Sequence, residues 1–365
     1  MAKYFAPAFE VTVNGSRLKA DVSRNIEQVQ VVSKPDTIDT FSLTIANPFP
    51  KLPWTHTSDA DLFKEGNTVT IKLGYADEDL QEMVSGEITH IQPTFPDSGV
   101  PTVTIEGQSL LHRLQGDSQT RTFQNKTDRQ IAEQIGQEAG LSVDAEDTGS
   151  PLDYIIQANR TDLDFLKDRA SKLHFEILVQ NKTLMFRKAK ETSKKVYTLV
   201  WAQAQKSFAS GSTALPLKSF SPQINTKKPV NQVEYRSYDH KTKQAFVVSA
   251  SVADQASKMG GSRSGAEVAA AAFQKTRKQV FVTMPFASEA EGHQMATASY
   301  NENAMEFVTG KAEAIGIPDL RAGCVVELQG VGPRFNGEYY LDEVTHSIGS
   351  GGYQTSLSVK RNGTS

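Results

Sequence analysis

The feature that most constrains this fold is a pattern of strands and glycines that occurs twice, at residues 63–107 and at 320–361. In the aligned copies FKEG at 63–66 matches LRAG at 320–323, and VSGEI at 84–88 matches FNGEY at 335–339. Each copy closes on alternating apolar and polar residues, the pattern of a strand with one buried face. Chance alignment of two meanders is the alternative, because glycine and alternation are common in β proteins.

The first hundred residues are typical of short antiparallel strands. Phe9, Val11 and Val13 alternate before Asn14-Gly15, a strong hairpin dipeptide, and further alternating rows follow at 41–45, 69–73 and 103–105. These rows predict a small barrel or sandwich. The connection from Pro48 to Asp61 is long and irregular, so we consider it, and the turn at 349–352, as candidate interface elements against the alternative of ordinary surface loops.

The apolar period changes from two to about three and a half near Thr122, which indicates a second domain. Thr127 with Gln130 predicts a capping box, and Gly140 is the expected stop of that helix. A second helix is expected to begin after Thr161, with a hairpin following it that turns at 180–182. Two helices followed by a hairpin predict a compact α+β unit.

The remainder predicts strands interrupted by helices. KAKETSKKV at 188–196 is read as a solvated linker rather than a phosphate-binding patch, because no aromatic residue is interleaved. Strands are expected at 217–223, 230–238 and 245–252. Ser264 predicts the cap of an alanine-rich helix that continues to Gln279, and Ser288 the cap of a helix towards Met305.

Together these patterns predict a mainly β protein with an α+β component. We expect two similar antiparallel β-barrel domains, an α+β domain between them and a helical insertion in the second barrel. The predicted boundaries are a first, tube-like barrel at 1–115, the α+β domain at 116–190, a second tube-like barrel from 191–250 and 306–365, and the helical insertion at 251–305.

Composition excludes several classes of protein. The chain has 365 residues, 38% hydrophobic and 22% charged, with a net charge of -3, which is typical of a globular protein and argues against a specific nucleic-acid site. Cys324 is the single cysteine, and the first residues contain no apolar run long enough for a signal peptide or membrane anchor. We therefore expect folding in a reducing cytoplasm.

Catalytic chemistry has weak support in the sequence. Candidate acids for glycan hydrolysis cluster near the predicted helices, but acids at such positions are more often caps and solvated faces. The histidines lack the i, i+4 spacing of metal ligands, and the glycine turns at 330–332 and 349–352 are not followed by a helix. We predict no catalytic, cofactor or metal site. The residues considered are Glu133, Glu138, Asp144, Asp147, Asp162 and Asp164, with His56, His90, His112, His174, His240, His293 and His346.

Two similar barrels in one chain have a geometric consequence. Homo-oligomers usually form closed rings, and three copies of such a chain place six alike barrels around one axis. A trimer of this kind imitates a hexamer, which is the property that an adapter between a sixfold and a threefold object needs.

Several stretches resemble the phage late control protein D family. They are FEVTVNGSRLKADVSR, FKEGNTVTIKLGY, VSGEITHIQP, FQNKTDRQIAEQIGQEAGL, RTDLDFLKDRASKLHFEILVQNKTLMFRKA and the closing FNGEYYLDEVTHSIGSGGYQTSLSVKRNG. These stretches span nearly the whole chain in order. The family comprises central baseplate hub proteins of contractile tails and is similar to the amino-terminal hub region of the VgrG spikes of type VI secretion.

The resemblance implies a structural baseplate hub, assembled in the bacterial cytoplasm and located in the tail baseplate of a virion or an equivalent contractile injection particle. It implies a homotrimer whose pseudo-sixfold ring joins the hexameric tail tube to a trimeric spike, with baseplate wedge or tape-measure proteins as further partners. Because the chain stops at Ser365 without a β-helical extension, we expect the spike to be a separate polypeptide. It implies no enzyme activity and no cofactor.

Two other functions stay open at the level of the sequence. One is a tail module that binds or hydrolyses cell-wall glycans, and the other is a secreted spike that carries cargo. The second would require toxin-like sequence beyond the hub, and the chain shows none.

Overall fold

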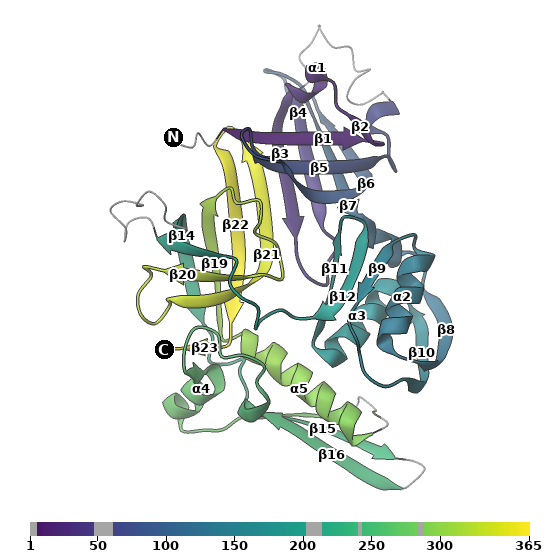
Figure 1. The fold of residues 1–365 in the computed structure, drawn as a ribbon, viewed down its shortest axis with the longest axis vertical. Helices are drawn as coiled ribbons and strands as arrows, with labels where there is room; N and C mark the ends of the chain where they lie inside the picture. Colours follow the sequence, from purple (N-terminus) through teal and green to yellow (C-terminus); the bar gives the residue numbers. More distant parts are fainter. Residues whose placement is uncertain (1–5, 47–60, 202–213, 240–242, 283–285, 287) are drawn as a thin grey trace.

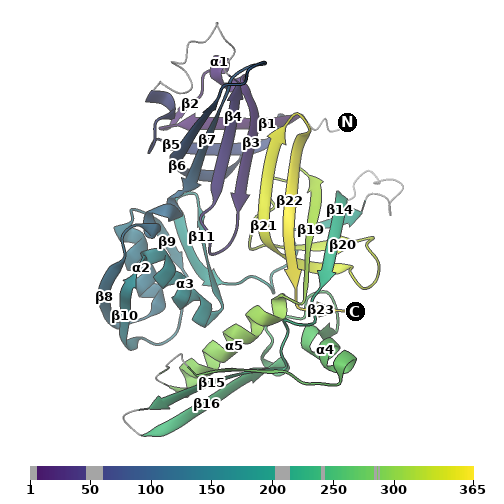
Figure 2. The same cartoon turned by 180° about the vertical axis from the view of Figure 1, so that it is seen from behind.

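The computed structural model describes residues 6–46, 61–201, 214–239, 243–282, 286 and 288–365. The described residues are mainly β-strand, arranged in five sheets with helices packed at one side and at one end (Figure 1). Seen from behind in Figure 2, the first strands stand above, and the longest helix, α5 (Glu289–Met305), crosses below the second set of strands. No described helix combines the length and apolar character needed to cross a membrane.

The amino-terminal strands form one curled sheet around an apolar core. Its order is β2-β1-β5-β6-β7-β4-β3. Asn14 and Gly15, both with positive φ, make the tight turn between β1 and β2, as the Asn-Gly dipeptide predicts. A four-residue helix, α1 (Ala20–Ser23), precedes β3. The bounds are β1 Pro7–Val13, β2 Ser16–Arg17, β3 Ile26–Ser33, β4 Thr40–Ala46, β5 Thr68–Tyr75, β6 Gln81–Thr94 and β7 Thr102–Ser109.

The carboxy-terminal set closes into a six-stranded barrel. Its order β21-β20-β13-β14-β19-β22 returns to the start because β22 also pairs with β21. In the first set no described pairing joins β1 to β3. Over the described residues the ring of hydrogen-bonded strands is therefore closed in the second set and open in the first. The bounds are β13 Tyr197–Trp201, β14 Ala214–Ile224, β19 Val308–Ile315, β20 Val325–Gln329, β21 Gly337–Gly349 and β22 Gly352–Arg361.

The two sets share their strand order. In chain order the strands β1, β3, β4, β5, β6 and β7 take the same places in the first sheet as β13, β14, β19, β20, β21 and β22 in the barrel. Two β-bulges also coincide: one follows Ile88 in β6 and Leu341 in β21, and the other follows Ile26 in β3 and Leu217 in β14. The repeat seen at 63–107 and 320–361 therefore corresponds to three equivalent strands in each set. In the second strand, however, the pairings make Ile88 equivalent to Leu341, two residues beyond its match in the sequence alignment.

One ladder joins the two sets. Strand β3 pairs antiparallel with β21, from Val344 opposite Ser33 to Ile348 opposite Val29. Ile348 and Tyr353, which belong to the second set, are buried in the apolar core of the first set. The 13-stranded sheet is thus continuous across the two sets.

The α+β unit folds largely as its local signals predict. Thr127 and Gln130 form a full capping box, Gly140 adopts positive φ after the helix, and Thr161 accepts from the Asp164 amide. Asn181 and Lys182 make the turn of the expected hairpin. The bounds are β8 Gln119–Lys126, α2 Asp128–Glu138, β9 Ser142–Ala145, β10 Leu152–Arg160, α3 Asp162–Leu173, β11 Phe175–Gln180 and β12 Thr183–Lys188.

The segment between β14 and β19 differs from the expectation. Strands predicted for the second barrel at 230–238 and 245–252 pair instead in a separate three-stranded sheet, β16-β15-β18, because their buried face, including Val233 and Ala250, packs on α5. The alanine-rich helix ends at Phe273, since Gln274 is left-handed, and 278–281 forms a strand rather than helix. The bounds are β15 Gln232–Asp239, β16 Gln244–Ser251, β17 Arg263–Ser264, α4 Gly265–Phe273, β18 Lys278–Phe281 and β23 Gly363–Thr364.

Gly107 tests how tightly the first sheet is packed. A Cβ there would lie 2.2 Å from Cζ of Phe41 and 2.4 Å from the Glu87 carbonyl oxygen. Gly107→Ala is expected to lower the free energy of unfolding by about 1–3 kcal/mol through overpacking. Gly116→Ala is the control, because its nearest contact would be 3.8 Å away. Urea denaturation measures both, and equal stabilities would contradict this packing.

Candidate functional site

A polar cavity lies where the four parts of the chain meet. Its volume is about 360 Å³, and its walls come from the β3–β4 turn, α3, β11, the linker after β12, α5, β21 and β22. We call eight of the polar residues around it the polar junction: Lys34, Asp36, His174, Glu176, Glu191, Tyr340, Asp342 and Lys360. No local sequence pattern predicted this site, because its members come from six separate segments of the chain.

Asp36 ties the β3–β4 turn to the α+β unit. Its amide donates to the Ile177 carbonyl at 2.8 Å, and its carboxylate accepts from the Ile177 amide at 2.8 Å. Burial raises the pKa of Asp36 to about 6, although the hydrogen bond from Ile177 opposes the shift. At the base of the same turn, Asp39 accepts from the Lys34 amide at 3.2 Å, and burial raises its pKa to about 7.

Glu176 joins β11 to the barrel. The residue is 3% exposed, and its carboxylate accepts a hydrogen bond from the Tyr340 hydroxyl of β21. Arg187 on β12 pairs with the same carboxylate, with Nε to Oε1 at 3.0 Å. Burial raises the pKa of both Glu176 and Tyr340, and the neighbouring Glu176 charge adds to the rise at Tyr340. The phenol therefore keeps its proton and donates a hydrogen bond to the carboxylate.

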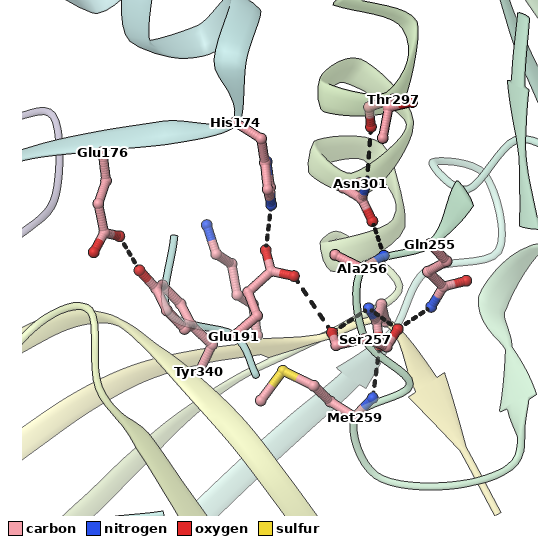
Figure 3. A network of polar contacts seen from close by, with 12 residues as sticks. His174, Glu176, Glu191, Gln255, Ala256, Ser257, Met259, Thr297, Asn301 and Tyr340 are labelled. Carbon is pink, nitrogen blue, oxygen red and sulfur yellow. Dashed lines mark hydrogen bonds and ion pairs between the residues drawn. The ribbon is translucent and has the colours of Figure 1, made fainter. Parts of the chain in front are cut away.

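Glu191 is the centre of the network in Figure 3. It lies in the linker expected to be solvated, yet it is 5% exposed and contacts the His174 ring at 3.0 Å. The Ser257 hydroxyl donates to its other oxygen at 3.4 Å. The neighbouring lysines of the linker, Lys190 and Lys194, are exposed as predicted. One buried acid in an otherwise solvated stretch thus connects α3 and β11 to the segment before α4.

Two asparagines complete the network. Asn301 on α5 accepts from the Ala256 amide at 2.7 Å, and Asn362 after β22 accepts from the Met259 amide at 2.9 Å. The Asn362 amide also donates to the Ser257 carbonyl at 2.8 Å. Figure 3 shows Glu191 between His174 and Ser257, with Asn301 of the helix bonded to the neighbouring Ala256 amide. The segment at 254–259 is therefore held from both the helix and the end of the barrel.

Asp342 occupies the bulge of β21 and binds two lysines. It contacts Lys360 at 2.8 Å and Lys34 at 3.5 Å, and although burial would raise the pKa of Asp342, these lysines lower it. Lys360 also lies over the Tyr340 ring, 5.5 Å from its centre. Through the pair of Lys34 with Asp342, these charges connect the turn after β3 to the barrel.

A second polar contact locks the ladder between β3 and β21. His346 is fully buried, with Nε2 2.9 Å from the Leu320 carbonyl and Nδ1 2.9 Å from the Tyr353 hydroxyl. Burial lowers its pKa to about 3, so the ring is neutral. The Tyr75 hydroxyl of the first set donates to the Gly316 carbonyl of the second at 2.7 Å.

The carboxylates considered for glycan hydrolysis are spread over the α+β unit. Arg121 pairs with Glu138 at 2.5 Å and with Asp162 at 2.7 Å, which brings these two acids to one cation. Glu133 pairs with Arg129 at 2.8 Å, and the Asp164 amide donates to the Thr161 hydroxyl that caps α3. Asp144 lies in β9, and Asp147 accepts from the Gly149 amide. Most of these acidic side chains therefore take part in ion pairs or hydrogen bonds within the α+β unit.

The histidines that the structure describes do not gather in one place. His112 contacts Glu87 at 2.6 Å and His293 lies 3.7 Å from Asp254, whereas His90 is exposed on β6. His56 and His240 fall outside the described residues. Over the ranges that the structure describes, no three His, Cys, Asp or Glu side chains are grouped as metal ligands.

The candidate interface elements have different outcomes. The loop from 48 to 61 falls almost wholly outside the described residues. The turn at 349–352 joins β21 to β22, and a Cβ at Gly349 would lie 3.6 Å from the Glu27 carbonyl of the same chain. A contact of this turn with another copy stays a prediction.

Asp36→Asn tests the buried carboxylate. The pKa of Asp36 rises from 3.8 to about 6 on folding, so its contribution to stability is present below pH 3.8 and is lost as the pH rises through 6. The amide keeps an acceptor for Ile177 and does not ionise. Between pH 4 and pH 8 we expect the variant to gain up to about 3 kcal/mol on the wild type in urea denaturation.

The control for this titration is Asp97→Asn, which changes an exposed loop aspartate. Its stability difference from the wild type should not vary over the same pH range. Parallel curves for Asp36→Asn and the wild type would show that Asp36 is not buried as an acid.

Tyr340→Phe tests the contact between the barrel and the α+β unit. It removes the donor to buried Glu176, which should cost about 1–3 kcal/mol and speed tryptic cleavage at the exposed linker residues Lys190 and Lys194. Tyr339→Phe is the matched control, because it removes only a hydrogen bond to the Phe335 carbonyl of the same barrel. Equal cleavage rates for the two variants would mean that the Tyr340 contact does not hold the units together.

Comparison with solved structures shows a fold shared with tail proteins. A 43 kDa tail protein of prophage MuSo2 from Shewanella oneidensis superposes with a TM-score of 0.72 at 13% identity, covering 98% of each chain. A tail protein from Neisseria meningitidis MC58 gives 0.70 at 16% identity, covering 98% of this chain and 97% of that one. The Escherichia coli c3393 protein, a type VI secretion component, gives 0.58 at 11%, covering 96% and 76%.

No curated protein sequence matches the chain. The model of one protein family, described as the Alg8 N-terminal domain, matches residues 5–350. Since this match spans nearly the whole sequence, the chain belongs to the Alg8 N-terminal domain family.

Proposed function

We propose that this protein is a structural, non-enzymatic component of a phage tail or related injection machine, and more narrowly the central baseplate hub. The observation that carries the proposal is the repetition of one six-strand order in a single chain, with the two sets joined edge to edge by β3 and β21. The fold shared with two tail proteins and with a type VI secretion component supports the same role.

In this proposal three copies form a ring. Because each copy carries two similar β units, three copies present six such units around one axis and match a sixfold tail tube on one side and a threefold spike on the other. The late control protein D resemblance supports the hub assignment. The particle, its tube and its spike are the partners, and assembly takes place in the bacterial cytoplasm before incorporation into the tail baseplate.

Each of the four parts of the chain has its own role in this proposal. We assign ring formation to the first β unit at 1–115 and to the closed barrel, and we assign the α+β unit at 116–190 to the outer side of the ring. The sheet of β15, β16 and β18 is grouped with the helical insertion, because it packs on α5. The polar junction fixes these parts relative to one another.

The mass of the purified chain in solution tests the proposal. One copy has a mass of 40.0 kDa, so three copies give about 120 kDa by multiplication, in keeping with a closed homo-oligomer. We expect the three-copy species in sedimentation across a range of concentrations. A chain that remains at one copy at every concentration contradicts a self-assembling hub. Loss of turbidity when the chain is added to cell-wall suspensions would contradict the non-enzymatic role.

A further inference from the structure

Strand β21 divides one of its edges between two partners. Residues 337–340 pair with β20 of the barrel, and residues 344–348 pair with β3 of the first set. Its equivalent, β6, pairs with β5 through 81–87, and no described strand pairs with the same edge beyond that point. The equivalent of β3, strand β14, pairs with β13 through 214–217, and the rest of that edge likewise has no described strand beside it.

These two edges are the equivalents of the two that join inside the chain. We propose that β14 of one copy pairs antiparallel with β6 of the next copy, so that the contact between copies repeats the β3–β21 contact within a copy. This inference rests on the proposed function, because it names the surfaces that close the ring. The contact is head to tail, the type that generates a ring when its rotation closes.

The shared bulges fix the register of this seam. The cross-strand row Val31, Phe41, Gly107, Ile88 in the first set corresponds to the row Pro222, Gly310, Val359, Leu341 in the second. Within the chain, Thr345 lies opposite Val32 and His346 opposite Val31. Along these rows Gln92 is the equivalent of Thr345, and Gln223 is the equivalent of Val32. The same register therefore places Gln92 of one copy opposite Gln223 of the next.

The same register places Pro93 opposite Pro222. Neither residue carries an N–H group, so the seam has fewer main-chain hydrogen bonds than the β3–β21 ladder. Proline on an edge strand also keeps unrelated strands from pairing with it. The seam between copies is therefore weaker than the junction within a copy, and its edges are protected while the copies are apart.

An apolar side chain marks the far end of the seam. Ile348, at the end of the β3–β21 ladder, is 8% exposed and packs in the first core. Its equivalent, Phe95, is 64% exposed. In the proposed register Phe95 lies opposite Phe220 of the next copy, whose ring is 5.5 Å from Tyr339 in the barrel. Forming the seam would bury part of this exposed phenyl ring, which favours association.

Cysteine cross-linking tests the seam. In a Cys324→Ala background, Gln92→Cys with Gln223→Cys places two thiols opposite each other, within the separation of about 7 Å between Cα atoms that a disulfide permits. The control pairs Gln92→Cys with Lys218→Cys, which lies five residues along the strand and about 16 Å away. Oxidation of the matched pair should give two-chain and three-chain species on a non-reducing gel, at least tenfold more than the control.

Sedimentation of the same proteins before oxidation separates the two proposals. A three-copy mass with no cross-link from the matched pair overturns the seam and leaves the proposed hub standing. Equal cross-linking of the matched and control pairs overturns the seam as well, because it indicates collision rather than register. A one-copy mass at every concentration, without cross-links, overturns both.

Discussion

The pairing of β3 with β21 is the constraint on which the rest of this structure depends. A strand has two edges, and β21 uses one for β22 and divides the other between β20 and β3. Because side chains alternate along a strand, a slip of one residue in this ladder would turn Ile348 out of the first core. Buried His346 and Tyr353 bond to each other and to the barrel beside the ladder, which resists such a slip.

The polar junction holds the remaining parts in relation to that continuous sheet. Asp36, in the turn after β3, bonds to Ile177, and Tyr340 of β21 bonds to Glu176, so both strands of the ladder lead to contacts with the α+β unit. Hydrogen bonds to buried charges are directional, and loss of one partner leaves a buried polar group without a hydrogen bond, which lowers stability. The junction is therefore suited to fixing orientation, even though burial raises the pKa of Asp36 and reduces what this group adds at neutral pH.

Local signals in the sequence were sufficient for single elements. The caps at Thr127, Thr161, Ser264 and Ser288 and the turns at 14–15 and 181–182 were predicted, because each depends on side chains and backbone within a few residues. The strands at 230–238 and 245–252 were also predicted as strands. Their sheet was assigned wrongly, because alternation indicates a buried face and says nothing of what covers it. Packing of that face on α5 decided the matter.

The sequence by itself determined the mainly β character, the α+β unit and the repeat that aligns β5, β6 and β7 with β20, β21 and β22. Only the tertiary structure decided which set closes into a ring, which edge joins the two sets and where Asp36, Glu176, Glu191 and Tyr340 meet. The physical reason is distance along the chain. Helix caps and hairpin turns are encoded by neighbours, whereas strand pairing between residues 33 and 344, or a hydrogen bond from Tyr340 to Glu176, depends on how complete units pack.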